Sequence, residues 1–541
     1  MRGLLAGLGL LALAWTSVAP AQVVERPAGD PVPTEAGLVA GKTLPSGVRA
    51  WMGVPFAAPP LRDLRWRDPQ PHARWTGVWN ADRPAPECIQ TLRGRSINHY
   101  FGEEATSEDC LYLNIWAPPQ PPPAGQRYPV IVWIYGGGFN VGSASMANYA
   151  GEPLAAKGAV YVSVTYRLGP LGFLAHPALS AEGGGHSGNY GLKDQVAALQ
   201  WVQRNIAGFG GDPANVTIAG QSAGSMSVSL LQASPAARGL FHKVVGMSGG
   251  AFGSVMAPAP LAEAEAEGVA IQKALGADSI DAMRDMPADR VIALAAPVRR
   301  RPIVLDGVVV PVTPQAAFAA RAQNDVPTMI GFTRDESFRS LGPIASVADL
   351  EKAIRTAFPA TAAKIMTAYP AATADEARRA ARDIERDSTL GVQMAQWAQV
   401  QGSVGKAPVF AYLFARTHPY RPGVTFADHD PATVGAYHTA DVPYWLGTLD
   451  SLNLFRVTRD WTPKDRQLSD DMTDRLMTFA RSGRPGSDWA AFQARGPRVH
   501  LFDVAGQRQA GAMIDWPHFS VLGLFADAPP PAPAERPRIR D

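Results

Sequence analysis

Residues 216–224 read Val-Thr-Ile-Ala-Gly-Gln-Ser-Ala-Gly, a β-branched run followed directly by a serine between glycines. The last five residues form a G-x-S-x-G pattern, and the residues from Ser225 onward are typical of a helix. At a strand-to-helix junction this pattern predicts a turn so tight that the serine hydroxyl projects above the sheet. Because a chain with 52 glycines can contain the five-residue pattern by chance, the flanking strand and helix carry the inference. They make Ser222 the candidate nucleophile.

Short apolar runs alternate with longer helical patterns on both sides of this segment. The runs are rich in Val, Ile and aromatic residues with little polar alternation, which is typical of strands covered on both faces. The expected strands are 130–135, 160–165, 216–219, 244–247, 328–330 and 409–414, and the expected helices include 192–206, 261–275, 347–358 and 374–386. The alternation predicts an α/β fold with a mostly parallel sheet flanked by helices. Ligands of such sheets bind at the C-terminal ends of the strands, so we expect the chemistry there.

A glycine-rich turn follows the expected strand 130–135. Residues 136–139 read Gly-Gly-Gly-Phe, and residues without side chains let backbone N–H groups approach a substrate closely. A serine nucleophile needs such donors for the oxyanion that its attack on a carbonyl group creates. We therefore expect the N–H groups of Gly137, Gly138 and Ala223 to form an oxyanion hole. The alternative for residues 136–139 is a flexible loop that happens to contain three glycines.

The serine also needs a base and an acid that orients this base. Two adjacent carboxylates, Asp335 and Glu336, come just after the expected strand 328–330 and are equal candidates by spacing. Three of the ten histidines follow the expected strand 409–414, namely His418, His429 and His438. The chain order serine, acid, histidine is the one used by sheets with this kind of turn. The residues alone leave both choices open.

Composition limits the classes of function. The 541 residues include 50 Lys and Arg and 48 Asp and Glu, so the net charge is 50 − 48 = +2 at pH 7. This near-balance argues against a basic nucleic-acid scaffold, and we expect no nucleic-acid partner. Hydrophobic residues make up 46% of the chain, which is enough for a large packed core and argues against extensive disorder.

Both ends of the chain differ from its body. Residues 1–21 combine Arg2, a short apolar run and the small-residue end Ala-Pro-Ala, which predicts a secretory signal peptide cleaved after Ala21. The alternative is an uncleaved N-terminal anchor. No later window approaches the ~18 uninterrupted apolar residues of a membrane helix, so we expect no integral membrane segment in the mature, secreted or periplasmic chain. Residues 528–541 are rich in Pro and Arg and are expected to be a disordered tail.

The chain contains two cysteines, Cys88 and Cys110, which lie 22 residues apart. In an oxidising compartment two thiols at this spacing can form a disulfide, and closing the loop would stabilise the fold by roughly 3 kcal/mol. Two free buried thiols are the alternative.

Several longer motifs resemble one family. They are residues 107–114 (Ser-Glu-Asp-Cys-Leu-Tyr-Leu-Asn), the glycine loop at 135–139, residues 189–195 (Asn-Tyr-Gly-Leu-Lys-Asp-Gln), residues 209–213 (Phe-Gly-Gly-Asp-Pro), residues 305–307 (Leu-Asp-Gly), and residues 435–438 (Gly-Ala-Tyr-His) followed by Pro-Tyr at 443–444. Together with the serine turn they are similar to those of type-B carboxylesterases, the large α/β-hydrolases related to cholinesterases. The resemblance covers roughly residues 30 to 525.

The resemblance implies a fold and a set of site residues. It implies a single α/β-hydrolase domain over residues 22–527, with helical insertions over the active site. It implies a catalytic triad of Ser222, Glu336 and His438, because the family motif has its acid at the second position of the Asp-Glu pair and its histidine shortly before an aromatic-rich segment. It also implies a disulfide between Cys88 and Cys110. The family needs no metal and no cofactor.

Three positions depart from the family pattern. Choline-hydrolysing relatives have a Trp ten residues before the second cysteine, where this chain has Tyr100, and a tyrosine face holds a cation less well. The residue before the nucleophile is usually Glu and is Gln221 here, which removes a negative charge beside the site and weakens attraction for cationic substrates. Many bacterial relatives have His before the three glycines, where this chain has Tyr135. A choline ester is therefore not the first expectation for the substrate.

These observations lead to a functional hypothesis with alternatives. We expect a serine carboxylesterase that hydrolyses a small-molecule ester through an acyl-enzyme. A bulky plant or fungal metabolite ester, such as a mycotoxin, is an alternative substrate, and amide cleavage or lipase activity is an alternative chemistry. A non-catalytic binding protein on the same fold is a further alternative. The arginines at 299–301 suggest attraction of an anionic ester, although a charge run is usually a solvated face.

Overall fold

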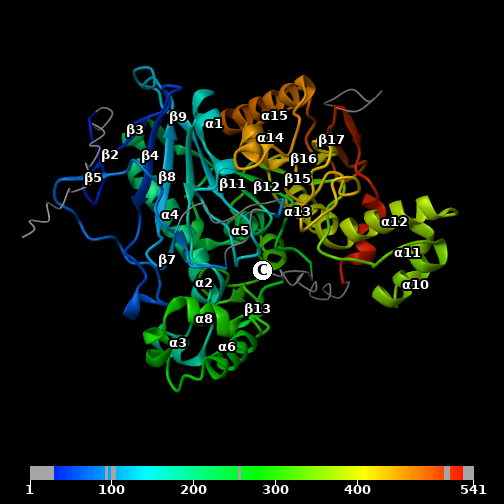
Figure 1. The fold of residues 1–541 in the computed structure, drawn as a ribbon, viewed down its shortest axis with the longest axis horizontal. Helices are drawn as coiled ribbons and strands as arrows, with labels where there is room; N and C mark the ends of the chain where they lie inside the picture. The colour runs from blue at the N-terminus through cyan, green and yellow to red at the C-terminus, as the bar shows by residue number, and fades with distance from the viewer. Residues whose placement is uncertain (1–29, 92–95, 99–104, 254–256, 505–511, 528–541) are drawn as a thin grey trace, which may run out of the picture.

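A large sheet organises the computed structural model, which describes residues 30–91, 96–98, 105–253, 257–504 and 512–527 (Figure 1). The sheet has eleven strands in the order β18-β17-β16-β15-β12-β11-β9-β10-β8-β4-β3. In chain order they are β3 (Lys42–Thr43), β4 (Arg49–Pro55), β8 (Tyr112–Ala117), β9 (Tyr128–Ile134), β10 (Val160–Val164), β11 (Gly211–Gln221), β12 (Lys243–Met247), β15 (Thr328–Thr333), β16 (Val409–Phe414), β17 (Arg498–Phe502) and β18 (Met513–Asp515).

The centre of the sheet is parallel. All neighbouring strands from β17 to β10 pair in parallel, while β18 at one edge and β8, β4 and β3 at the other pair antiparallel. The six strands expected from the sequence all lie in the parallel part. The predicted mostly parallel sheet is therefore confirmed.

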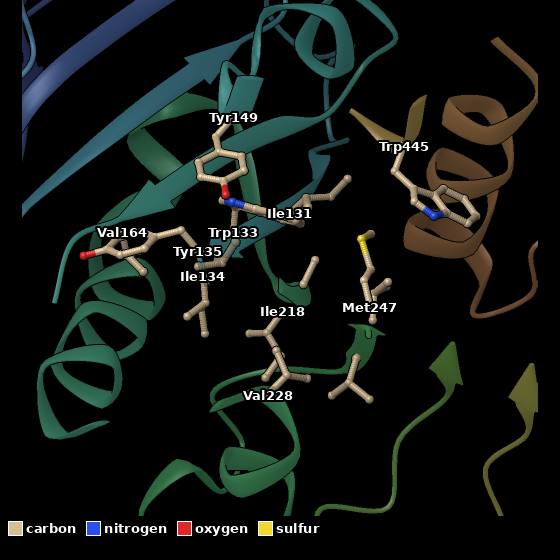
Figure 2. Packing of buried hydrophobic residues seen from close by; sticks show 14 of the residues in the cluster. Ile131, Trp133, Ile134, Tyr135, Tyr149, Val164, Ile218, Val228, Met247 and Trp445 are labelled. Carbon is tan, nitrogen blue, oxygen red and sulfur yellow. The ribbon is translucent and has the colours of Figure 1, made fainter. Parts of the chain in front are cut away.

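Continuous apolar runs form these central strands because both faces are covered. The side chains of Ile131, Trp133, Ile218 and Met247 are fully buried. Figure 2 shows that these residues, from three neighbouring strands, pack into one core. Strands without a solvent-facing side have no need for polar alternation.

Helices cover the sheet on both sides. In Figure 1, α1 and α15 lie above the sheet, and α4 and α5 lie below it. Helix α5 contacts β9, β11 and β12, α15 contacts β9 and β11, and α13 contacts β15 and β16. These helices and their neighbours are α1 (Glu152–Ala156), α4 (Tyr190–Asn205), α5 (Ala223–Ala233), α9 (Pro314–Ala319), α13 (Val392–Val404), α14 (Val442–Trp445) and α15 (Pro463–Ser482).

Two further groups of helices pack around apolar clusters of their own, apart from the main core. The first group consists of α2 (Gly169–Phe173), α3 (Pro177–Glu182), α6 (Leu261–Leu275), α7 (Ile280–Asp285) and α8 (Ala288–Ala295), and the second of α10 (Val347–Ala357), α11 (Ala362–Ala368) and α12 (Ala374–Arg386). Ile271, Met283 and Val291 are buried in the first group, and Ile354 and Ile384 in the second. Both groups are helical insertions that pack beside the main core.

Strand β11 is longer than expected. The sequence predicts a strand at 216–219, but β11 begins at Gly211, where a pairing with Tyr128 precedes an irregularity in the register. It also continues through Gln221, because the last residues pair with both β9 and β12. The strand therefore runs directly into Ser222.

A disulfide joins Cys88, at the end of β6 (Glu87–Cys88), to Cys110, which lies shortly before β8. The sulfur atoms are 2.06 Å apart, as in a formed bond. The pairing implied by the family resemblance is thus present, and the alternative of two free thiols is wrong. The expected signal peptide (1–21) and tail (528–541) lie outside the described residues. Across the described ranges, no helix has the length and apolar character needed to cross a bilayer.

We predict that replacing both cysteines, Cys88→Ser with Cys110→Ser, lowers the free energy of unfolding by about 3 kcal/mol. The reason is that no crosslink then closes the loop between these residues, which are 22 apart in sequence, so the unfolded chain is no longer restricted. Urea unfolding monitored by tryptophan fluorescence measures this difference. Treatment of the original protein with a reductant should shift the unfolding midpoint in the same direction. Equal midpoints for the oxidised, reduced and doubly substituted proteins would contradict the prediction.

Candidate active site

Ser222 occupies a strained turn between β11 and α5. Its φ is +57° and its ψ is −124°, a backbone conformation that residues other than glycine rarely adopt. Its N–H donates to the carbonyl of Met247 at 2.8 Å, which ties the turn to β12. Such strain persists only where the surrounding structure enforces it, and it is concentrated at functional sites.

The two flanking glycines make this turn sterically feasible. A Cβ at Gly220 would lie 2.5 Å from the backbone of Gly224, and a Cβ at Gly224 would collide with the carbonyl oxygen of Ile134. Strand β11, helix α5 and strand β9 thus lie so close together that Gly220 and Gly224 have no room for a side chain. The G-x-S-x-G pattern is therefore a packing requirement of this turn.

The hydroxyl of Ser222 is the first member of a hydrogen-bonded series. Nε2 of His438 lies 2.8 Å from Ser222 Oγ, and Nδ1 of His438 lies 2.6 Å from Oε2 of Glu336. The other carboxylate oxygen of Glu336 accepts a hydrogen bond from the N–H of Thr333 at 2.9 Å. Glu336 is 2% exposed, so water does not compete for its carboxylate. The structure thus brings together the three residues that the resemblance implies.

Asp335, the rival acid, has a different place. Its Oδ2 accepts hydrogen bonds from the N–H of Ala436 at 2.8 Å and from the guanidinium of Arg334. Asp335 therefore holds the loop that carries His438, while its neighbour Glu336 faces the imidazole.

The two rival histidines also have other partners. His418 is buried, its Nε2 lies 2.8 Å from the carbonyl of Ala440, and burial holds its pKa well below the usual range. His429 contacts the hydroxyl of Tyr420 at 3.1 Å and the carboxylate of Asp428 at 3.2 Å. Both belong to the aromatic packing around the loop after β16.

The glycine loop lies beside the serine turn. A Cβ at Gly136 would lie 2.5 Å from the carbonyl oxygen of Gln221, so the two segments are in backbone contact. Gly137 and Gly138 have φ values of +123° and +61°. Their N–H groups have no acceptor among the described residues, and Ala223 begins α5, where helical amides lack an intrahelical partner. These three amides are free to bind an anion.

Gln221 contacts the histidine, a role that the sequence did not predict. Its Nε2 donates to the carbonyl oxygen of His438 at 2.7 Å and lies 3.4 Å from the Nε2 atom of the same residue. Tyr135, a second departure from the family pattern, is buried and stacks on Tyr166 at a ring distance of 4.5 Å, while Tyr100, the third, lies outside the described residues. Tyr135 therefore supports the start of the glycine loop through packing.

Asp441 is a second buried carboxyl close to the histidine. The hydroxyl of Tyr412 donates to its Oδ2 at 2.7 Å. Burial, together with the negative charge of Glu336, raises the pKa of Asp441 to about 7. No sequence motif singled out this residue, because the groups that surround it, Tyr412 on β16 and Glu336, lie in other segments of the chain. Within the described ranges, no group of three or more His, Cys, Asp or Glu side chains is placed to hold a metal ion.

Comparisons with known proteins agree with this architecture. Residues 29–510 match the model of the carboxylesterase family. The chain is 36% identical over 515 residues to a fumonisin B1 esterase of Sphingopyxis macrogoltabida, covering 90% of each chain, and 33% identical over 496 residues to a para-nitrobenzyl esterase of Bacillus subtilis (strain 168), covering 87% of this chain and 94% of the relative. A solved structure of a thermophilic PNB esterase matches with a TM-score of 0.75 and 31% identity, covering 92% of this chain and 99% of that chain.

The sheet order, the serine turn and the structural matches define the class of protein, which is the α/β-hydrolases. The expected fold class is confirmed. Within this class, the chain belongs to the carboxylesterase family and is a carboxylic-ester hydrolase. The family implies small-molecule esters as substrates.

We predict that Asp441→Asn changes how stability depends on pH. The folded protein keeps the Asp441 proton up to about pH 7, whereas the unfolded chain loses it near pH ~4. Between these values the folded state binds more protons, so this group makes the protein less stable as the pH rises. Asparagine does not titrate, and its amide oxygen still accepts from Tyr412.

Urea unfolding at several pH values between about 4 and about 7 tests this. The stability of Asp441→Asn relative to the original protein should rise steadily across that window. A constant difference between the two proteins would show that Asp441 does not exchange its proton there.

Proposed function

We propose that this protein hydrolyses esters through an acyl-enzyme formed on Ser222, with His438 as the base and Glu336 as the residue that orients it. The observation that carries the proposal is the series of two short hydrogen bonds, Ser222 to His438 to Glu336. A serine hydroxyl is a weak nucleophile until an adjacent base takes its proton. The strained turn supports this role, because it holds the hydroxyl in place before the substrate arrives.

The proposed reaction proceeds in two halves, acylation of Ser222 and hydrolysis of the acyl-enzyme. His438 Nε2 takes the proton of Ser222 as Oγ attacks the ester carbonyl, and the carbonyl oxygen becomes an oxyanion. His438 then donates the proton to the leaving alcohol, which leaves an acyl group on Ser222. Water attacks this acyl group with His438 again as base, and the acid departs. Glu336 stabilises the imidazolium without taking its proton.

The oxyanion is assigned to the amides of Gly137, Gly138 and Ala223. Fixed N–H donors stabilise charge that develops in the transition state without reorganising. The positive φ of Gly137 and Gly138 and the place of Ala223 at the start of α5 support the assignment. No residue of this mechanism calls for a metal or a cofactor.

A bulky metabolite ester is the substrate that the comparisons favour within this proposal. The relative at 36% identity is named for fumonisin B1 and another for a para-nitrobenzyl ester. These names support a large alcohol or acyl group rather than a choline ester. Rates on a soluble short-chain ester, its anilide and an emulsified triglyceride distinguish esterase from amidase and lipase activity.

We further propose export of the chain to the periplasm or the medium. The signal-like composition of residues 1–21 and the disulfide between Cys88 and Cys110 both support an oxidising compartment.

Ser222→Ala is the direct test of the nucleophile. We expect turnover of 4-nitrophenyl butyrate to fall on the order of 10⁶-fold, as when a triad serine is removed from other hydrolases. A covalent fluorophosphonate probe should label the original protein and leave the variant unlabelled, which also excludes a non-catalytic binding protein. The urea unfolding midpoint serves as the control for folding. Retention of most of the ester turnover by a folded variant would refute the assignment.

Gly137→Ala tests the oxyanion hole. A Cβ at Gly137 would collide with the carbonyl oxygen of Val141 and displace the loop, so we expect kcat to fall by at least about 10²-fold. Gly138→Ala is the matched control, because its Cβ would make only an ordinary contact with Asn140, 3.9 Å from Nδ2, at a φ of +61° that alanine tolerates at a modest cost. Its loss of kcat should be clearly smaller. Equal losses would place the oxyanion elsewhere.

A further inference from the structure

We propose that Arg300 recognises an anionic group, a carboxylate, on the ester substrate and so determines specificity at the rim of the site. This inference rests on the proposed function and adds a substrate class to it. Arg300 lies between α8 and β14 (Val304–Leu305), in the first helical insertion. It is the middle member of the three consecutive arginines at 299–301.

Arg300 reaches the glycine loop through one side chain. Its Nη2 donates to Oδ1 of Asn140 at 2.9 Å, and Nδ2 of Asn140 donates to the carbonyl oxygen of Gly138 at 2.8 Å. Two hydrogen bonds thus separate the guanidinium from a residue whose amide is assigned to the oxyanion. Gly138 and Asn140 are both exposed, so a substrate that approaches the loop meets this edge of the site.

The charge of Arg300 is not paired in an ion pair with any carboxylate of the described residues. No carboxylate lies within 4.0 Å of its guanidinium in the part of the chain that the structure describes, and its Nη1 is buried there without a hydrogen-bond partner. Asn140 is neutral, so it satisfies one donor without compensating the charge. Burial lowers the pKa of Arg300 to about 10, which still leaves it protonated at neutral pH.

The charge of the neighbouring Arg301, in contrast, is compensated by two carboxylates. Arg301 pairs with Glu263 at 2.7 Å and with Glu267 at 3.0 Å, and its backbone N–H also donates to Glu267 at 2.8 Å. The carboxylate of Glu267 acts on Arg300 only at longer range, because Arg301 holds it.

A substrate carboxylate would supply the missing charge. An uncompensated and partly desolvated cation is costly, and a substrate carboxylate beside the accessible part of the guanidinium would offset part of this cost through a charge-assisted hydrogen bond. The site is therefore built to favour esters that carry a carboxylate over neutral esters of the same shape.

Matched ester pairs test the proposal. The pair 4-acetoxybenzoate and 4-acetoxybenzamide differs in charge on the alcohol side, and the 4-nitrophenyl esters of adipic acid and adipamic acid differ on the acyl side. The measured quantity is the ratio of kcat/KM for the anionic ester to that for its neutral amide. In the original protein we expect this ratio to exceed one for at least one pair.

Variants assign the preference to Arg300. Arg300→Gln should lower the ratio about tenfold or more for the preferred pair, and Arg300→Lys should retain part of it. Arg299→Ala is the matched control, because it removes the same formal charge from an exposed neighbour and should leave the ratio within about threefold. Asn140→Asp keeps Arg300 but gives it a protein counter-ion, so it should also lower the ratio.

The outcomes separate the two proposals. If both esters of a pair slow equally in Arg300→Gln, Arg300 merely supports the glycine loop and the inference is overturned. A ratio near one for both pairs in the original protein overturns it as well. If Ser222→Ala keeps its turnover, the proposed function fails, whereas the ratios in the Arg300 variants still report on anion recognition.

Discussion

The close approach of β9, β11 and α5 around Ser222 is the constraint on which the rest of the site depends. At Gly220, Gly224 and Gly136 the neighbouring chain segments are so close that any Cβ would collide with their backbone. Because the turn has no room to relax, Ser222 remains at a positive φ that would otherwise be unfavourable. The same packing fixes the serine turn against the glycine loop. Ser222, the proposed nucleophile, and the proposed oxyanion donors therefore form one unit, as preorganised electrostatic catalysis requires.

The histidine depends on a different set of contacts. It lies on a loop after β16, far from the serine in sequence, and polar side chains hold that loop at two points. Gln221 donates to the carbonyl oxygen of His438, and Asp335 accepts from the N–H of Ala436. Gln221, which precedes Ser222, and Asp335, which precedes Glu336, thus both hold the loop that carries His438, the proposed base. Gln221 holds the loop through a neutral amide, whereas the Glu that is usual in the family would place a negative charge there.

The sequence predicted those parts of the structure that local patterns encode. The six buried strands followed from continuous apolar runs, and the serine turn followed from glycines at fixed offsets. The choice of Glu336 over Asp335 did not follow from spacing, because adjacent residues point in different directions and only the tertiary structure decides which one meets the imidazole. The family resemblance supplied that choice.

Other features had no signal in the sequence at all. The contact of Gln221 with His438, the raised pKa of Asp441 and the hydrogen bond of Arg300 to Asn140 each arise between segments that the fold alone brings together. Local periodicity describes the strand or helix that carries a residue. It does not describe the residue's neighbours from elsewhere in the chain.

The strand order has a consequence for how the protein folds. The site draws on residues from 136 to 438, and β9 pairs with both β10 and β11 while β12 pairs with β15, so distant segments must meet before the turn at Ser222 is enforced. Topologies dominated by such long-range parallel pairings fold slowly, because loop closure costs entropy before contacts repay it. The strained turn gains its support only after β9, β11 and β12 are in register. A chain that has formed its helices but not this register therefore carries Ser222 without the turn that holds its hydroxyl.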